Sequence, residues 1–445
     1  MSEVLRSVGL DVGTTSTQMI LSELTVENRA SGFAVPEMEI VDRKIVYKSP
    51  VHFTPLLDES HVDGDALRRL VEQEYRAAGI TRERVDTGAV IITGETSRKE
   101  NARTVLEVLS DLAGDFVVAT AGPDLESILA AKGAGADQLS ETLGKPVVHM
   151  DIGGGTSNLA LIREGKILRT TCLNVGGRLI KFDENGTVFY ISPVLRGIWD
   201  GKTADPEQLK DVAKILVRAL EMAVGLRPPT KLLEDLTTKE LISRWEIPEG
   251  VVLSFSGGVA DCIDTEQPWQ KFGDLGPILG KAIRESCLCE GRYVLGQETI
   301  RATVIGAGCH SAQLSGSTVF QQNITYPLKN VPVVFPQPNA ESIRQALSMQ
   351  ETAAMMALTG VESPTYAQVG ALAEEILRGT EGPVLVCLEQ DMAKALGQAL
   401  AVRSERSRQI LCIDRVRIPE GSFLDVGAPV GPAMPVVVKT LILSK

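Results

Sequence analysis

Residues 150–158 read MDIGGGTSN, and this stretch decides the fold. The mostly apolar residues 147–150 end at Asp151, three consecutive glycines follow, and a second apolar stretch begins after the turn. Glycine weakens a strand because it has no side chain to pack, so three in a row are typical of a turn that a ligand or another backbone must approach closely. The pattern predicts a strand, a ligand-binding turn and a second strand, with Asp151 at the start of the turn.

The beginning of the chain repeats this arrangement. Residues 8–16 read VGLDVGTTS, in which Asp11 ends an apolar strand and glycine and hydroxyl residues form the turn. Closely spaced backbone N–H groups suit the oxygens of a phosphate chain, and a carboxylate beside them can hold the water shell of Mg²⁺. Because the two aspartates lie about 140 residues apart in equivalent positions, we expect two related lobes that bring Asp11 and Asp151 to one metal ion.

Two further motifs follow predicted strands. Ser256, Gly257 and Gly258 come after the apolar residues 251–255, and this position favours contact with the adenosine side or the α-phosphate of a nucleotide. Glu95 lies between a predicted strand and a predicted helix, where a carboxylate could orient water for attack on a γ-phosphate. Capping of the helix by Thr96 or Ser97 explains that polar cluster equally well.

The order of strand and helix patterns predicts an α/β protein with three parts. We expect lobe I at residues 1–145 and lobe II at residues 146–325, with the more charged segment of about 182–248 inserted in lobe II. A cluster of prolines after about residue 318 marks a boundary. Residues 326–445 then form an additional C-terminal α/β region.

Composition excludes several classes of function. Hydrophobic residues make up 44% and charged residues 23%, as in folded soluble proteins. The net charge of -12 opposes binding to nucleic acid or anionic lipid, and no apolar run reaches membrane-spanning length. We expect a cytoplasmic protein with no nucleic-acid or membrane partner. Seven cysteines, an odd number, favour reduced thiols, and His149 is expected to be packed or solvent-facing rather than metal-bound.

The motifs, in this order, resemble those of the superfamily of actin, sugar kinases and heat-shock chaperones, together with small-residue helices at 130–136 and 306–308. Within it, residues 8–16, 93–102, 150–158 and 435–441 resemble the ethanolamine ammonia-lyase reactivating factors, over nearly the whole chain. The resemblance implies a two-lobed, actin-like (ribonuclease H-like) ATPase fold. It also implies a chaperone-like, ATP-dependent activity that releases damaged cobalamin from inactivated ethanolamine ammonia-lyase, so that intact adenosylcobalamin can replace it.

The same resemblance implies the cofactors ATP and Mg²⁺ and a set of site residues. Catalysis falls to Asp11 and Asp151, with Mg²⁺ near both. Glu95 is added to the predicted catalytic residues because of its position between strand and helix. The remaining nucleotide-binding residues are Gly13, Thr14, Thr15, Gly153, Gly154, Gly155, Thr156, Ser256, Gly257 and Gly258. No lysine lies beside the first turn, unlike in the chaperone relatives, so we expect slow turnover.

Two other functions are compatible with these motifs. A small-molecule kinase of the same fold would use Glu95 as the base that activates a substrate hydroxyl. A scaffold or filament would bind ATP without hydrolysing it. The sequence leaves open whether the protein forms a homo-oligomer and whether it associates with a bacterial microcompartment.

Overall fold

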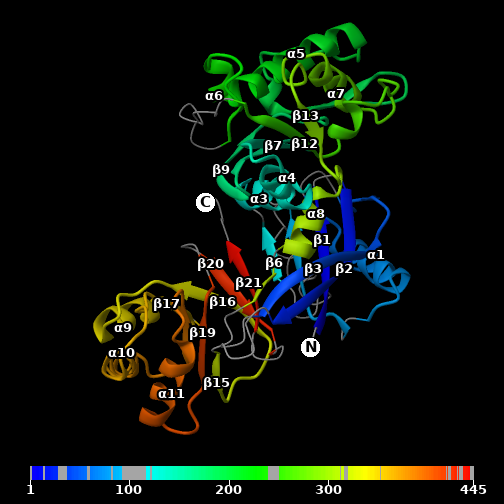
Figure 1. Cartoon of the computed structure of the whole chain (residues 1–445). Coiled ribbons are helices and arrows are strands. Elements are labelled where there is room, and N and C mark those ends of the chain that lie inside the picture. The colour runs from blue at the N-terminus through cyan, green and yellow to red at the C-terminus, as the bar shows by residue number, and fades with distance from the viewer. Residues whose placement is uncertain are drawn as a thin grey trace.

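The computed structural model has an α/β fold of two stacked lobes and a C-terminal α/β region beside lobe I, which confirms the predicted fold class (Figure 1). No helix in the part of the chain that is described is both long and apolar enough to cross a bilayer. The described residues are 3–13, 16–28, 38–57, 61–81, 84–92, 117–120, 123–238, 250–310, 312–314, 319–350, 352–416, 418, 422–427, 429 and 434–440.

Lobe I is built on one mixed sheet. Its elements are β1 (Glu3–Val12), β2 (Ser16–Asn28), β3 (Met38–Lys48), β4 (His52–Phe53), α1 (Gly64–Ala77), β5 (Thr87–Ile92) and β6 (Val117–Thr120). The strand order is β3-β2-β1-β5-β6, with the first three antiparallel and the last two parallel to β1. Asp63 caps α1, which packs Leu67, Val71 and Tyr75 onto the sheet at helical spacing.

Lobe II repeats this topology. Its strands and helices are α4 (Ala136–Leu143), β7 (Val147–Ile152), β8 (Ser157–Arg163), β9 (Lys166–Leu173), β10 (Ile180–Phe182), β11 (Val188–Ile191), α5 (Pro206–Ala223), α6 (Lys231–Leu236), β12 (Val252–Ser256), α7 (Gly276–Arg284) and β13 (Tyr293–Leu295). The order β9-β8-β7-β12-β13 has the same strand directions as the sheet of lobe I. The two lobes are therefore two versions of one architecture.

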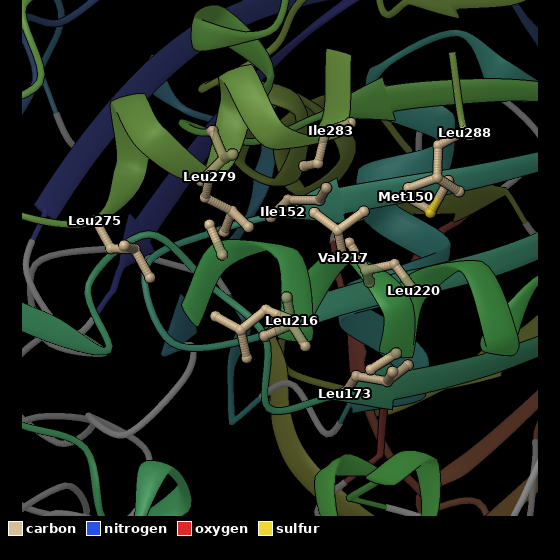
Figure 2. Close-up of a cluster of buried hydrophobic side chains, with 14 of the residues drawn as sticks. Met150, Ile152, Leu173, Leu216, Val217, Leu220, Leu275, Leu279, Ile283 and Leu288 are labelled. Atoms are coloured by element: carbon tan, nitrogen blue, oxygen red, sulfur yellow. The ribbon is translucent and has the colours of Figure 1, made fainter. Parts of the chain in front are cut away.

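Helices α1 and α5 have equivalent positions in the order of elements along the chain. Each comes after the antiparallel strands of its lobe and before the strand that is parallel to the central one, β5 in lobe I and β12 in lobe II. Figure 2 shows Leu216, Val217 and Leu220 of α5 in the same apolar cluster as Met150 and Ile152 of β7. The segment of about 182–248, expected as an insertion, thus supplies a helix to the core of lobe II.

Two helices cross between the lobes, α3 (Pro123–Gly133) and α8 (Ala302–His310). Helix α3 follows β6 of lobe I but packs against β7, β8 and β9, whereas α8 follows β13 of lobe II but packs against β1, β2 and β5. Glycine permits their close crossing. A Cβ on Gly133 would lie 1.9 Å from the Ala302 carbonyl oxygen, and one on Gly306 would lie 2.0 Å from that of Leu129.

The C-terminal region is a second kind of α/β unit. Its elements are β14 (Ala312–Leu314), β15 (Phe320–Gln322), β16 (Leu328–Val334), α9 (Ala340–Ser348), β17 (Met355–Leu358), α10 (Tyr366–Gly379), β18 (Val384–Leu388), α11 (Ala393–Arg403), β19 (Ile410–Asp414), β20 (Ser422–Val426) and β21 (Pro435–Thr440). Four parallel strands, β16-β17-β18-β19, have the three helices on one face. Strands β20, β21 and β14 continue the same sheet from β16, and side chains of β20 and β21 pack with those on the other face of the parallel strands. The region contacts lobe I where β21 meets β6.

Candidate nucleotide site

Each lobe presents one hairpin turn at the end of its central strand. In lobe I the Gly13 N–H donates to the Ser16 carbonyl oxygen at 2.9 Å, and in lobe II the Gly153 N–H donates to that of Thr156 at 2.9 Å. The two turns close with the same hydrogen bond and follow equivalent strands. Thr14 and Thr15, predicted to bind phosphate, lie outside the described residues.

Both turns line one cavity between the lobes, and the structure brings most of the predicted site residues to it. Those residues are Asp11, Gly13, Asp151, Gly153, Gly154, Gly155, Thr156, Gly257 and Gly258. Asp11 and Asp151 thus reach a shared space from separate halves of the molecule. Glu95 lies outside the described residues, so its catalytic role stays a prediction.

The glycines of the site have two different physical roles. Gly257 has a φ of +86°, and a Cβ there would lie 2.3 Å from the Ile152 carbonyl oxygen, so the fold itself requires glycine. A Cβ on Gly155 would meet nothing within 4 Å, although this residue lines the cavity. Packing within the protein therefore does not require glycine at position 155. The absence of a side chain there leaves more of the cavity open to a ligand.

The sequence predicts that Ser256 faces the far end of a nucleotide, but in the structure its side chain contacts Asp151. It is in register with Asp151 on the neighbouring strand, and its hydroxyl donates to Asp151 Oδ1 at 2.5 Å. Residues in register on adjacent strands point to the same face of the sheet, and this places Ser256 behind the aspartate. Burial raises the pKa of the Asp151 carboxyl to about 6, while hydrogen bonds from Ser256 and Thr303 act in the opposite direction.

Glu126 of α3 is a third carboxylate in the cavity, and the sequence reasoning missed it. Burial and, to a smaller extent, the negative charges of Asp11 and Asp151 together raise its pKa to about 8, against a hydrogen bond from the Asn158 side chain. The signal that could have found it is a glutamate in the first turn of a predicted helix whose following residues, 127–133, are mostly small or apolar.

Arg178 supplies a positive charge beside the second turn. Its backbone N–H donates to the Gly154 carbonyl oxygen at 2.6 Å, and its Nε lies 3.2 Å from Asp274 Oδ2. The side chain packs against Gly154 and lines the cavity. Arg178 of lobe II therefore provides a positive charge at the cavity, whereas the first turn has no lysine beside it. The local sequence could not show that Arg178 lies beside the second turn.

The charges of the cavity favour an anionic ligand only when a cation accompanies it. Among its described lining residues, Arg178 is the single cation. It is paired with Asp274 and shares the cavity with the carboxyl groups of Asp11, Glu126, Asp151 and Asp261, of which Glu126, with its raised pKa, is mostly uncharged near neutral pH. Such a wall would repel a bare triphosphate, whereas a bound cation of charge +2 would reverse the local field.

The residues present fit a hydrated magnesium ion. Mg²⁺ bound with a nucleotide takes one or two carboxylates and fills its other positions with water and phosphate oxygens. Asp11 and Asp151 both line the cavity, from opposite lobes, and would be the carboxylates that hold such an ion. Nearby, the Oδ1 atom of Asn158 is buried and has no hydrogen-bond partner in the described part of the chain, so it can accept from a metal-bound water.

Two lobes of one strand order, joined by crossing helices around a cavity with a carboxylate-led turn from each, define an actin-like, ribonuclease H-like ATPase fold. A family model described as ethanolamine utilisation protein EutA matches residues 3–444, and the chain belongs to that family. The resemblance to the ethanolamine ammonia-lyase reactivating factors is thereby confirmed.

Relatives of the same family align over almost their whole length. The chain is 40% identical over 464 residues to the ethanolamine ammonia-lyase reactivase EutA of Salmonella typhimurium, with 98% of each chain covered. It is 39% identical over 462 residues to the protein of that name from Escherichia coli, again with 98% of each covered.

A solved structure of the Aquifex aeolicus PPX-GPPA enzyme is 12% identical, covers 68% of this chain and 99% of its own, and has a TM-score of 0.42.

Proposed function

We propose that this protein binds Mg²⁺ and ATP between its lobes and uses ATP hydrolysis to reactivate ethanolamine ammonia-lyase. The observation that carries the proposal is the shared cavity, which two equivalent turns line with a carboxylate from each lobe. Two relatives at about 40% identity carry the name of a reactivase of that enzyme. The activity consists of releasing damaged cobalamin from the lyase, after which intact adenosylcobalamin takes its place.

The turns hold the phosphate chain. Backbone N–H groups of residues 154–156 donate to phosphate oxygens, and Arg178 adds a positive charge on the side of lobe II. Thr14 and Thr15 stay predicted phosphate contacts in lobe I. Asp11 and Asp151 hold the metal through its water shell. When bound, Mg²⁺ supplies positive charge that offsets the charge of the phosphate oxygens. Gly257 and Gly258 leave room at the opposite end for the rest of the nucleotide.

Glu126 is the carboxylate that the geometry favours for orienting the attacking water. It projects from α3 into the cavity shared with Asp11 and Asp151, and its pKa of about 8 lies near neutral pH, where a general base is most effective. The Asn158 side chain holds the carboxylate in place by donating a hydrogen bond to it. Glu95, the residue predicted for this role, stays an alternative.

Coupling to the lyase follows from the crossed helices. Because α3 and α8 each join one lobe to the sheet of the other, closure of the lobes on a nucleotide moves both helices together. A surface of the lobes that contacts the lyase would change shape with the nucleotide state. Binding energy from ATP could then loosen the lyase around its damaged cofactor.

The decisive experiment is a reactivation assay with inactivated lyase. We expect activity to return only when this protein, ATP, Mg²⁺ and free adenosylcobalamin are all present, and not with a non-hydrolysable ATP analogue. Recovery without ATP would overturn the proposal. Stoichiometric phosphorylation of ethanolamine or a sugar would show a kinase instead, and ATP binding with polymerisation but no hydrolysis would show a scaffold.

A further inference from the structure

A polar stripe runs along one face of β7 and β12 toward the cavity. Alternate residues of these parallel strands share the face that α3 and α4 cover, and they pair in register. The pairs, in order toward the cavity, are Val147 with Val252, His149 with Ser254, and Asp151 with Ser256. The first pair is apolar and belongs to the core, so packing alone does not call for polar residues at the other two.

Hydrogen bonds join the polar members of the stripe into a chain. His149 Nδ1 lies 3.1 Å from Ser254 Oγ, and His149 Nε2 lies 2.9 Å from Ser256 Oγ. Ser256 Oγ in turn lies 2.5 Å from Asp151 Oδ1. His149 and Ser256 are fully buried. Because a buried polar group without partners is costly, the imidazole needs both serines for its two nitrogens.

Only one set of donors satisfies this chain when Asp151 is ionised. A carboxylate accepts and cannot donate, so the Ser256 hydroxyl must donate to Asp151. Ser256 can then only accept from His149, and Nε2 must carry the proton of a neutral imidazole. Nδ1 is left as an acceptor, and the Ser254 hydroxyl donates to it. The protons therefore all point toward the cavity, from Ser254 through His149 and Ser256 to Asp151.

We propose that His149 is a positioning residue for Asp151: its Nε2–H holds the Ser256 hydroxyl in the orientation that donates to the aspartate. The carboxylate is then fixed by hydrogen bonds from within the protein, and its remaining lone pairs are directed to the cavity. This inference rests on the proposed function, since it assumes that Asp151 holds a metal-bound nucleotide. A histidine that merely fills the core would leave the affinity for that ligand unaffected.

The first test determines the tautomer of His149 in the absence of nucleotide. The chain has four histidines, so nitrogen NMR of the full-length protein labelled with ¹⁵N-histidine gives few signals, and the His149→Gln variant identifies the one from His149. We expect the neutral Nε2–H tautomer, with Nδ1 accepting a hydrogen bond. The Nδ1–H tautomer or an imidazolium signal would overturn the proposal, because Ser256 could not then be held as a donor in this way.

The second test measures the dissociation constant of Mg²⁺ with a non-hydrolysable ATP analogue by calorimetry. We expect His149→Phe and Ser256→Ala each to weaken binding by roughly 10–100-fold, the usual effect of removing a group that orients a metal ligand. Because His149 acts through Ser256, the double variant should bind no more weakly than Ser256→Ala alone. His149→Gln, whose amide can both donate and accept, should recover much of the affinity.

The outcomes separate this proposal from the proposed function. Wild-type affinity in His149→Phe, or losses that multiply in the double variant, would overturn the positioning role alone. If the wild-type protein itself fails to bind the nucleotide with Mg²⁺, the proposed function falls, and the role of His149 falls with it. Melting temperatures of all variants, measured beside the binding data, identify any loss of affinity that comes from unfolding.

Discussion

Burial sets the proton affinity of the cavity residues before any ligand arrives. With a contribution from the charges of Asp11 and Asp151, burial raises the pKa of Glu126 to about 8, and it raises that of Asp151 to about 6. Behind the cavity, burial lowers the pKa of His149 to about 3. In every case the charged form is disfavoured in a poorly solvated site. A cation in the cavity would restore the charge of the two carboxylates, so the free protein is poised to release protons when it binds a metal.

The first prediction concerns Glu126 and pH. The folded state, with a pKa of about 8, binds this proton more tightly than the unfolded chain, whose ordinary value is 4.5. The stability from this group is thus fully present below pH 4.5 and is lost as pH rises through about 8. Glu126→Gln should make the free energy of unfolding less dependent on pH between these values, as measured by urea denaturation.

A control on the exposed face of α1, Glu72→Gln, should keep the wild-type pH dependence. Identical slopes for Glu126→Gln and the wild-type protein would mean that the glutamate is already ionised at neutral pH. The position of its carboxyl would then have to be solvated rather than buried.

The second prediction concerns the two aspartates. Asp11→Asn and Asp151→Asn each remove a negative charge from the proposed metal site while keeping the shape of the side chain. We expect ATP hydrolysis to fall by roughly a hundredfold or more, with the circular dichroism spectrum unchanged. Steady-state phosphate release measures this, and turnover at the wild-type rate in both variants would refute the assigned roles.

The third prediction separates the glycines that the fold needs from those that a ligand needs. Gly257→Ala forces a Cβ against the Ile152 carbonyl and should cost about 1–3 kcal/mol of stability. Gly155→Ala meets no protein atom and should change stability by less than about 0.5 kcal/mol. The same variant should weaken nucleotide binding, since its methyl group occupies the cavity. Equal stability losses in the two variants would contradict this distinction.

At the scale of elements, the site depends on α3 and α8. Helix α3 carries Glu126, and α8 carries Thr303, which donates to Asp151. Each helix belongs by sequence to one lobe and by packing to the other. The crossing therefore holds side chains from both halves around one cavity, and the glycines at the crossing set how close the helices come.

The fourth prediction tests this crossing. Gly306→Ala places a Cβ 2.0 Å from the Leu129 carbonyl oxygen, so the helices must move apart. We expect a loss of about 1–3 kcal/mol in the free energy of unfolding, as for other overpacked sites, together with weaker nucleotide binding. Gly291→Ala, where a Cβ would meet nothing within 4 Å, is the matched control. A Gly306→Ala protein as stable as this control would show that the crossing is loose.

At the scale of the whole molecule, the lobes and the C-terminal region have separate cores. The apolar clusters of the lobes are drawn from residues up to 309, and those of the C-terminal region come from residues 319–438. Within the described ranges, the two parts contact each other chiefly through β21 with β6 and through β14 with β3 and α8. Units with their own cores and a small interface can unfold independently.

The fifth prediction follows from this division. Scanning calorimetry of the full chain should show two unfolding transitions. A non-hydrolysable ATP analogue with Mg²⁺ should stabilise only the transition of the lobes, by about 2.7 kcal/mol at a hundred times its dissociation constant. A single transition, or an equal shift of both, would show that the C-terminal region is coupled to the nucleotide site.

The two glycine turns could be predicted from sequence because everything that defines them is local. Asp11 and Asp151 each precede their own glycine turn, and a tight turn between apolar strands needs only neighbouring residues to form. Their convergence could be inferred because one motif occurs twice, and a repeated motif predicts a repeated fold. The family resemblance came from the same stretches.

Other members of the site depend on contacts between distant segments. Glu126 reaches the cavity because α3 crosses to the sheet of lobe II. Arg178 reaches it because a later loop packs against the second turn. Ser256 faces Asp151 because of the register between β7 and β12. Sequence by itself determined which residues make the turns and that two lobes exist, since strand, turn and repeat patterns are local. Only the tertiary structure decided which side chains surround the cavity, because helix crossing and strand register join residues far apart in the chain.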